Sequence, residues 1–290
     1  MTPEQTFSAL QRIARQEGRA VQELLTLYVL ERFLARLVES PYADSFVLKG
    51  GVLLAGYGLR RPTRDVDMQA IDFVLDEEHC GKVVAAVATA EADDGVAFDA
   101  IPTRIEQIRD EEEYSGLRVH VRAQLHRSPI ALKLDISTGD PISPHAQLVT
   151  MPRILGGEFT VMGHPPETVI AEKAVTILQR GATSTRWRDY MDLRSLALSR
   201  SFSAATLGKA IEEVAKHRTV ELSAPSGSLN GHDEVAQQKW AAWRKKTDVE
   251  DITLPVLEDQ LTEVCGFLDP IFTDEVEPAA AWDPTSKTWH

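Results

Sequence analysis

Hydrophobic periodicity divides the chain into a mixed first part and a helical second part. Apolar residues recur at helical spacing over residues 4–17 and 19–39, which predicts two N-terminal helices. Short apolar or alternating runs then predict strands near residues 46–48, 65–68, 96–107, 117–125 and 130–136, with one helix from Asp76 to about residue 90. We therefore expect an α+β fold, in which a mixed sheet with flanking helices forms the first part.

The pattern changes after Pro141. Residues 141–165 are rich in Pro, Gly and His and predict a connector with short strands at 147–151 and 158–162. Helical spacing then predicts helices near residues 167–180, 186–199, 203–217, 233–247 and 254–268, with a polar loop at 223–232 and a tail at 269–290 that is either mobile or docked. We expect a bilobed protein with an α/β lobe over residues 1–164 and a helical lobe over residues 165–290.

Composition narrows the class of protein. Hydrophobic residues make up 43% of the 290 residues and charged residues 26%, as in ordinary soluble globular proteins. Cys80 and Cys265 have no metal-ligand spacing, the N-terminus is polar, and no run is long enough to span a bilayer. These features predict a cytoplasmic protein with no membrane partner. The net charge of −13 argues against a protein that coats nucleic acid, although a local basic face remains compatible with it.

A glycine turn and two close carboxylates form the first candidate site. Lys49-Gly50-Gly51 follows a predicted strand and opens a predicted helix, whose free N–H groups can hold phosphate oxygens. Asp65 and Asp67 are two residues apart on a predicted strand, so they share a face and offer oxygen ligands suited to Mg²⁺. Each piece alone is usually a turn or a solvated strand edge. Their order along the chain is much rarer and favours metal-dependent handling of a nucleoside triphosphate.

Asp135 is the candidate third carboxylate. It lies near the end of the aliphatic strand 130–136, where a carboxylate is costly unless it is paired or bound to a metal. A strand-end Asp that turns into solvent is an equally good explanation of this residue alone. Together with Asp65 and Asp67, it would give the group of acids that phosphoryl and nucleotidyl transfer require.

The helical part carries a second cluster and several cations. Lys173 lies on the first helix, and Asp189 and Asp192 share one face of the next, which predicts either a structural ion pair or a cationic contact to a triphosphate. Residues that could contact RNA are Arg60, Arg61, Arg186, Arg188, Trp240, Trp243, Arg244 and Lys245. For the last four, the commoner alternative is an amphipathic helix that packs its indoles inward.

These motifs, in this order, resemble the AbiEii/MenT family of nucleotidyltransferase toxins in the polymerase-beta-like nucleotidyltransferase superfamily. The resemblance covers roughly residues 45–200. Five short segments carry it: Leu48-Lys49-Gly50-Gly51, Thr63-Arg64-Asp65-Val66-Asp67, Leu134-Asp135-Ile136, Glu172-Lys173-Ala174-Val175 and Arg188-Asp189-Tyr190-Met191-Asp192-Leu193.

The resemblance implies a toxin that uses Mg²⁺, in a two-metal site, to add a nucleoside monophosphate from an NTP and release pyrophosphate. In the MenT branch the acceptor is the tRNA 3′ end, so aminoacylation and translation stop, and a cognate antitoxin is the implied partner. Asp65, Asp67 and Asp135 would hold metal, and Lys173 would clamp the triphosphate with Asp192 orienting it. The implied nucleotide-binding residues are Lys49, Gly50, Gly51, Thr63, Arg64 and Asp189.

One departure and two alternatives remain at this point. Many nucleotidyltransferases have Gly-Ser at the turn, whereas this chain has Gly50-Gly51-Val52, so Thr63 is the candidate hydroxyl. The same chemistry could act on a small molecule or a protein hydroxyl, and a non-catalytic NTP-binding regulatory module is the alternative from another class. The three acids and Lys173 argue against the latter, because a silent module does not need them.

Overall fold

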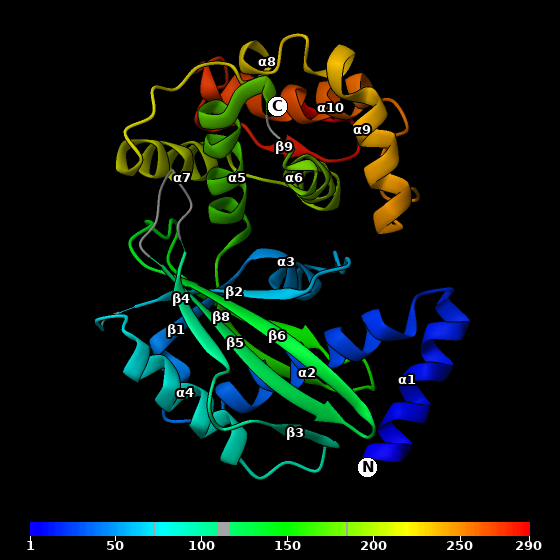
Figure 1. Ribbon diagram of the computed structural model, residues 1–290. Coiled ribbons are helices and arrows are strands. Elements are labelled where there is room, and N and C mark those ends of the chain that lie inside the picture. Colours follow the sequence, from blue (N-terminus) through cyan, green and yellow to red (C-terminus); the bar gives the residue numbers. More distant parts are fainter. Residues whose placement is uncertain (72, 109–115, 184) are drawn as a thin grey trace. The chain divides into compact units, whose positions relative to one another are not determined.

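The computed structural model describes residues 1–71, 73–108, 116–183 and 185–290 (Figure 1). The chain forms two compact units. The first contains Met1–Gly139 and Gln147–Gly163, and the second contains Asp140–Ala146 and His164–His290. A mixed sheet with helices in the first unit confirms the predicted α+β class. None of the described helices combines the length and the apolar character needed to cross a membrane.

Eight strands of the described chain form one sheet in the first unit, in the order β3-β5-β6-β2-β1-β8-β7, with β4 also paired to β5. β2 is antiparallel to β1 but parallel to β6, so the sheet is mixed as expected. The strands are β1 (Phe46–Lys49), β2 (Asp65–Ala70), β3 (Val96–Phe98), β4 (Arg104–Gln107), β5 (Gly116–Leu125), β6 (Ser128–Ser137), β7 (Gln147–Pro152) and β8 (Glu158–Gly163).

The long antiparallel pair β5–β6 separates a buried face of the sheet from a polar face. Val119 and Val121 on β5 are buried, and so are Leu132 and Leu134 on β6, whereas the residues between them are half-buried or exposed. Helix α2 packs against both strands. The apolar core of this unit therefore lies on the α2 side, and the other face is left to polar side chains.

Helices cover the first unit around this core (Figure 1). α1 is capped by Thr2, which accepts a hydrogen bond from the Gln5 amide in a capping box. Almost all of α2 is buried, and Arg36 within it pairs with Asp94 at 2.7 Å, which satisfies the buried charge. The helices are α1 (Pro3–Glu17), α2 (Val21–Leu37), α3 (Gly50–Leu53) and α4 (Glu77–Thr89), with 3₁₀ turns at Ala43–Ser45 and Leu54–Tyr57.

The strand predicted over residues 96–107 is divided into β3 and β4. Five residues lie between Phe98 and Arg104, whereas only two lie between their partners Ala123 and His120 on β5. The extra residues leave the ladder around Pro102, which cannot donate a backbone hydrogen bond. As a separate strand paired with β5, β4 extends the polar face of β5.

The second unit is helical, with a short connector from the first part of the chain held to it. Asp140 pairs with Arg218 at 3.2 Å, and Ser143 exchanges hydrogen bonds with Thr168. α10 packs against α6, α7, α8 and α9, and α5 packs against α6, α7 and α8. The helices are α5 (Pro166–Arg180), α6 (Trp187–Ser199), α7 (Ala204–His217), α8 (Pro225–Ser228), α9 (His232–Thr247) and α10 (Leu257–Phe272), with a 3₁₀ turn at Gly181–Thr183.

The C-terminal tail docks on the second unit as a small hairpin of β9 (Trp282–Asp283) and β10 (Thr288–Trp289). Trp282 is buried and donates a hydrogen bond to the Ala197 carbonyl at 2.7 Å. Its ring lies 4.8 Å from that of Phe267, on which Trp289 also stacks at 5.6 Å. Of the two predicted states of the tail, the docked one is observed. Helix α8 lies within the segment predicted to be only a loop.

Candidate active site

The three candidate acids project from one face of the sheet. Asp65 and Asp67 alternate along β2, and the parallel register places Asp67 directly beside Asp135 on β6. Residues paired across strands share a face, so the acids of both strands point the same way. All three side chains are half-buried. Strand alternation and a single parallel pairing therefore suffice to bring together the carboxylates that the sequence predicted.

Burial and the neighbouring acids both affect the pKa of Asp67. Burial raises the pKa of Asp67 to about 6, and the neighbouring Asp135 adds to the rise, while Lys49 and Arg61 act in the opposite direction. Lys49 is the partner of Asp67 in the β1–β2 register. Burial and the neighbouring negative charge thus both disfavour the ionised form of Asp67, a situation that a bound cation relieves.

Arg118 is a site residue that the sequence interpretation missed. It is the register partner of Asp135 on β5, and its Nε and Nη2 atoms donate to the two Asp135 oxygens at 2.7 Å each. This hydrogen bonding raises the pKa of the Arg118 guanidinium above its ordinary value. The alternation of β5 places Arg118 on its polar face, but a single sequence does not reveal that β5 lies beside Asp135.

The donor set fits a divalent cation. Oδ1 of Asp65 is buried and accepts no hydrogen bond from the described residues, so an acceptor is left open on the acid face. Carboxylate oxygens are the ligands that Mg²⁺ prefers. Within the described ranges, no three His, Cys, Asp or Glu side chains are already gathered as a metal-holding group. Arg118 donates to both oxygens of Asp135, so a metal held by all three acids would share this carboxylate with the guanidinium.

The glycine turn packs directly against Asp67. Gly50 has φ of +68°, and a Cβ added there would lie 2.0 Å from Oδ2 of Asp67. Only glycine fits both the left-handed backbone and this close approach. A Cβ on Gly51 would instead meet the flexible guanidinium of Arg61, at 2.8 Å. The predicted helix after the turn is present and short, because α3 ends at Leu53 and continues as a 3₁₀ turn.

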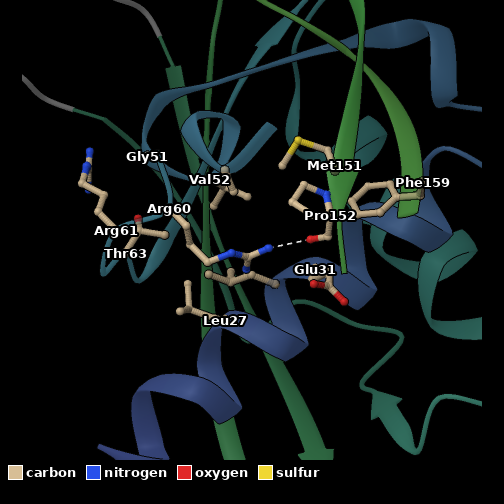
Figure 2. Close-up of a pocket in the computed structure, with 12 residues that line it drawn as sticks. Leu27, Glu31, Gly51, Val52, Arg60, Arg61, Thr63, Met151, Pro152 and Phe159 are labelled. Atoms are coloured by element: carbon tan, nitrogen blue, oxygen red, sulfur yellow. Dashed lines mark hydrogen bonds between the residues drawn. The ribbon is translucent and has the colours of Figure 1, made fainter. Parts of the chain in front are cut away.

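A pocket adjoins the turn within the first unit (Figure 2). It brings together Gly51, Arg61 and Thr63, three residues that the sequence suggested for contact with nucleotide or RNA. Arg60 also lines it and donates to the Pro152 carbonyl at 2.5 Å. Apolar side chains supply much of the remaining wall, from Leu27, Leu30, Val52, Met151 and Phe159. Arg64, in contrast, is exposed and does not line the pocket.

Thr63 is nearly buried, with 6% of its surface exposed, and its hydroxyl donates to the Asp65 carbonyl at 3.4 Å. The hydroxyl suggested as the substitute for the usual serine is therefore held just before β2. Thr63 thus lines the pocket and is bonded to the backbone of the first candidate acid.

Lys173, Asp189 and Asp192 form a compact ionic cluster in the second unit. Nζ of Lys173 lies 2.6 Å from Asp189 and 2.9 Å from Asp192, and both aspartates are buried. Burial alone would raise the pKa of Asp189, but Lys173 and Arg186 together lower it below its ordinary value. The predicted ion pair across the two helices is present, and its charges hold Asp189 in the ionised form.

The residues suggested for RNA contact differ in availability. Trp240 is completely buried and donates to the Leu254 carbonyl at 3.0 Å, while Arg244 is buried and bonded to Thr253 at 2.8 Å. An indole in the core cannot stack on a base, so we withdraw these two residues from the predicted set. Trp243 is half-buried against Trp240. Arg186, Arg188 and Lys245 are exposed.

The chain is similar to one known protein family and to solved structures. Residues 32–263 match the family model described as nucleotidyl transferase AbiEii toxin, Type IV TA system. A solved structure described as "putative nucleotidyltransferase from H. pylori" is 18% identical with a TM-score of 0.49, covering 87% of this chain and 97% of that one. The crystal structure of JHP933 from Helicobacter pylori is 17% identical with a TM-score of 0.49, covering 88% and 95%. No curated protein matches the chain.

Proposed function

The chain belongs to the AbiEii family of nucleotidyltransferase toxins from type IV toxin–antitoxin systems, and from that premise we propose that it transfers a nucleoside monophosphate from an NTP to the 3′ end of tRNA. The observation that carries this proposal is the register of β2 and β6, which sets Asp67 beside Asp135 on the face that also bears Asp65. The turn that requires glycine at position 50 packs against Asp67.

In the proposed reaction, the acceptor 3′ oxygen forms a bond to the α-phosphorus of the NTP. The bond from that phosphorus to the bridging oxygen breaks, pyrophosphate leaves, and the hydroxyl proton passes to a carboxylate or to water. Mg²⁺ held by Asp65, Asp67 and Asp135 would neutralise the triphosphate and stabilise the charge that develops on the leaving group. Asp135, at the edge nearest β5, is the acid that we assign to the acceptor hydroxyl.

The remaining residues would bind and orient the donor. Gly50 and Gly51 let the backbone approach the triphosphate, with Lys49 adding positive charge beside Asp67. Thr63 would donate its hydroxyl to a phosphate oxygen, and Arg64 extends the same segment. In the second unit, we assign Lys173 to the triphosphate, with Asp189 and Asp192 orienting its ammonium group.

Modification of the tRNA 3′ end would prevent aminoacylation and so stop translation in the cytoplasm, which is the consequence expected of a toxin. A protein of this kind requires neutralisation, and a cognate antitoxin is the partner that we propose. The net charge of −13 is compatible with an enzyme that binds one RNA end through a local basic surface.

The test is to incubate the protein with total tRNA, Mg²⁺ and each α-labelled NTP in turn, beside Asp65→Ala and Lys173→Ala variants. Label should enter RNA with the unmodified chain and fall at least ~100-fold with Asp65→Ala, because metal and charge contacts contribute several kcal/mol to such reactions. Label that appears only in small molecules or protein would reject the RNA acceptor. Equal labelling by Asp65→Ala would reject the assigned site.

A further inference from the structure

The face of the sheet that carries Asp65 and Asp135 continues outward as a row of basic residues. Residues paired across strands project from the same face. The register pairs Asp65 with Lys133, Lys133 with His120, and His120 with Arg104. A single line of paired positions therefore leads from the acids on β2 to the outer strand β4.

Two more basic residues lie on this face because they alternate with His120 along β5. Arg118 precedes His120 by two positions, and Arg122 follows it by two. We call the set Arg104, Arg118, His120, Arg122 and Lys133 the cationic face. The side chain of Arg104 is 67% exposed, and Arg122 and Lys133 are also exposed, so these charges face solvent.

Among the described residues, Arg122 and Lys133 are the members of this face that form no ion pair with an acid. Arg118 holds Asp135, and Glu106 is bonded to Arg104 at 2.5 Å and to His120 at 2.9 Å. For Arg122 and Lys133, no ion pair is present within the described part of the chain. Arg122 and Lys133 therefore add two exposed positive charges beside the candidate active site, in a protein whose net charge is −13.

We propose that the cationic face binds the phosphodiester backbone of the RNA whose 3′ end reaches Asp135, with Arg122 and Lys133 as its main phosphate contacts. This inference rests on the proposed function and names the surface that the acceptor follows. A row of like charges on a flat sheet matches a polyanion, whose affinity depends chiefly on phosphate contacts. Such contacts position the strand without reading its sequence.

The composition of this face favours RNA over a protein partner. Protein interfaces usually need a buried aromatic or aliphatic anchor at their centre. The large apolar side chains that the described residues expose are Met1, Val74, Ile101, Leu148, Val235, Ile252 and Val256, and none of them belongs to the polar face of β4, β5 or β6. Helix α9, the region first suggested for RNA, has its central indole in the core.

The inference is tested with a fluorescently labelled RNA oligonucleotide and the double variant Arg122→Gln/Lys133→Gln. RNA affinity, measured by anisotropy over a series of salt concentrations, should fall ~tenfold or more at low salt. The slope of log K against log salt should fall by about 1 for each residue removed. The matched control is Lys209→Gln/Lys216→Gln, which removes the same charge from the exposed face of α7. It should bind RNA like the unmodified chain.

Unchanged affinity and slope in the Arg122/Lys133 variant would overturn the inference, and so would an equal loss in the α7 control. Displacement of RNA by poly-glutamate at similar concentration, with the same dependence on Arg122 and Lys133, would assign the face to an acidic protein and also overturn it. The transfer assay distinguishes failure of the proposed function from failure of this inference. If the unmodified chain never labels RNA, the proposed function fails; if it labels RNA but the double variant keeps the same KM for RNA, only this inference fails.

Discussion

Arg118 holds Asp135 through two parallel hydrogen bonds of 2.7 Å each, between neighbouring strands of the sheet. Both oxygens of the third candidate acid are thus engaged by a guanidinium before any metal binds. The contact has two consequences. It fixes the orientation of Asp135, and it supplies positive charge to a group of carboxylates that would otherwise repel one another.

Arg118→Gln should make the protein depend more on divalent cations for its stability. Without the guanidinium, Asp135 is left next to Asp67 with less compensation, so the metal-free melting temperature should fall. Added Mg²⁺ should then stabilise the variant by roughly 2–4 °C more than the unmodified chain, as expected for about 1 kcal/mol of extra binding free energy. Thermal denaturation with and without Mg²⁺ measures this difference. The control is Arg127→Gln, an exposed change of the same charge in the turn between β5 and β6.

An equal Mg²⁺ shift in the unmodified chain, Arg118→Gln and Arg127→Gln would contradict this role of Arg118. A loss of all Mg²⁺ stabilisation in Arg118→Gln would also contradict it, because the variant keeps the three acids.

Gly50→Ala should be far more damaging than Gly51→Ala. The first change adds a Cβ 2.0 Å from the Asp67 carboxylate at a position with φ of +68°, whereas the second meets only the end of the Arg61 side chain. Left-handed backbone alone costs an alanine about 1–3 kcal/mol. We expect Gly50→Ala to lose stability and most nucleotide transfer, and Gly51→Ala to keep the fold. Urea unfolding and transfer rates of the pair check this, and similar values for both variants would contradict it.

Strand alternation made the shared face of the acids predictable from the sequence. The residues that contact the acids could not be predicted in this way. Asp65 and Asp67 must share a face whatever the partner strand, and an Asp within an aliphatic strand is conspicuous. The contact of Arg118 with Asp135 depends on which strands pair and in which register, and periodicity does not encode either. For the same reason, the sequence does not predict the line of basic residues across β4, β5 and β6, which depends on the register of the strands.

For the helices too, the sequence predicted the positions of the elements but not what their side chains contact. Apolar spacing located the ends of α1, α4 and α5 to within a residue or two, because each helix buries one face. It could not decide whether Trp240 and Trp243 meet core or ligand, since both outcomes give the same pattern. Nor could it show that the tail would dock, because Trp282 finds its aromatic partner Phe267 only in the folded unit.

Lys173→Met should destabilise the second unit in a pH-dependent way. The pKa of Asp189 is lowered in the folded protein, so its ionic contacts stabilise the fold above the ordinary Asp pKa of about 3.9 and lose that effect as the pH falls through the folded value. Removing the cation leaves two buried acids and should cost about 3–5 kcal/mol at neutral pH. The difference in unfolding free energy between variant and unmodified chain should shrink as the pH falls below about 3.9.

Urea unfolding at several pH values gives that difference, with Lys209→Met as the exposed control, whose partner Glu213 lies 3.7 Å away on the surface of α7. A penalty for Lys173→Met that is the same at all pH values, or no larger than that of Lys209→Met, would show that the buried cluster is not held by this charge.

Trp282→Ala should lower the free energy of unfolding of the second unit by about 3–5 kcal/mol, the usual cost of removing a buried aromatic side chain. The indole is 2% exposed, packs on Phe267 and donates to the Ala197 carbonyl. Trp243→Ala, at a half-buried position on α9, should cost clearly less. Denaturant unfolding of both variants checks the docking of the tail, and equal midpoints for Trp282→Ala and the unmodified chain would contradict it.

The central claim is that Asp67 and its neighbours transfer nucleotide to RNA with release of pyrophosphate, and the stoichiometry of that reaction tests it most directly. Pyrophosphate released and nucleotide added to RNA should be measured together for the unmodified chain, Asp67→Asn and the exposed control Asp93→Asn, whose side chain is 92% exposed. The account predicts one pyrophosphate per nucleotide added, lost in Asp67→Asn and retained in Asp93→Asn. Pyrophosphate release without RNA extension, or full activity in Asp67→Asn, would contradict it.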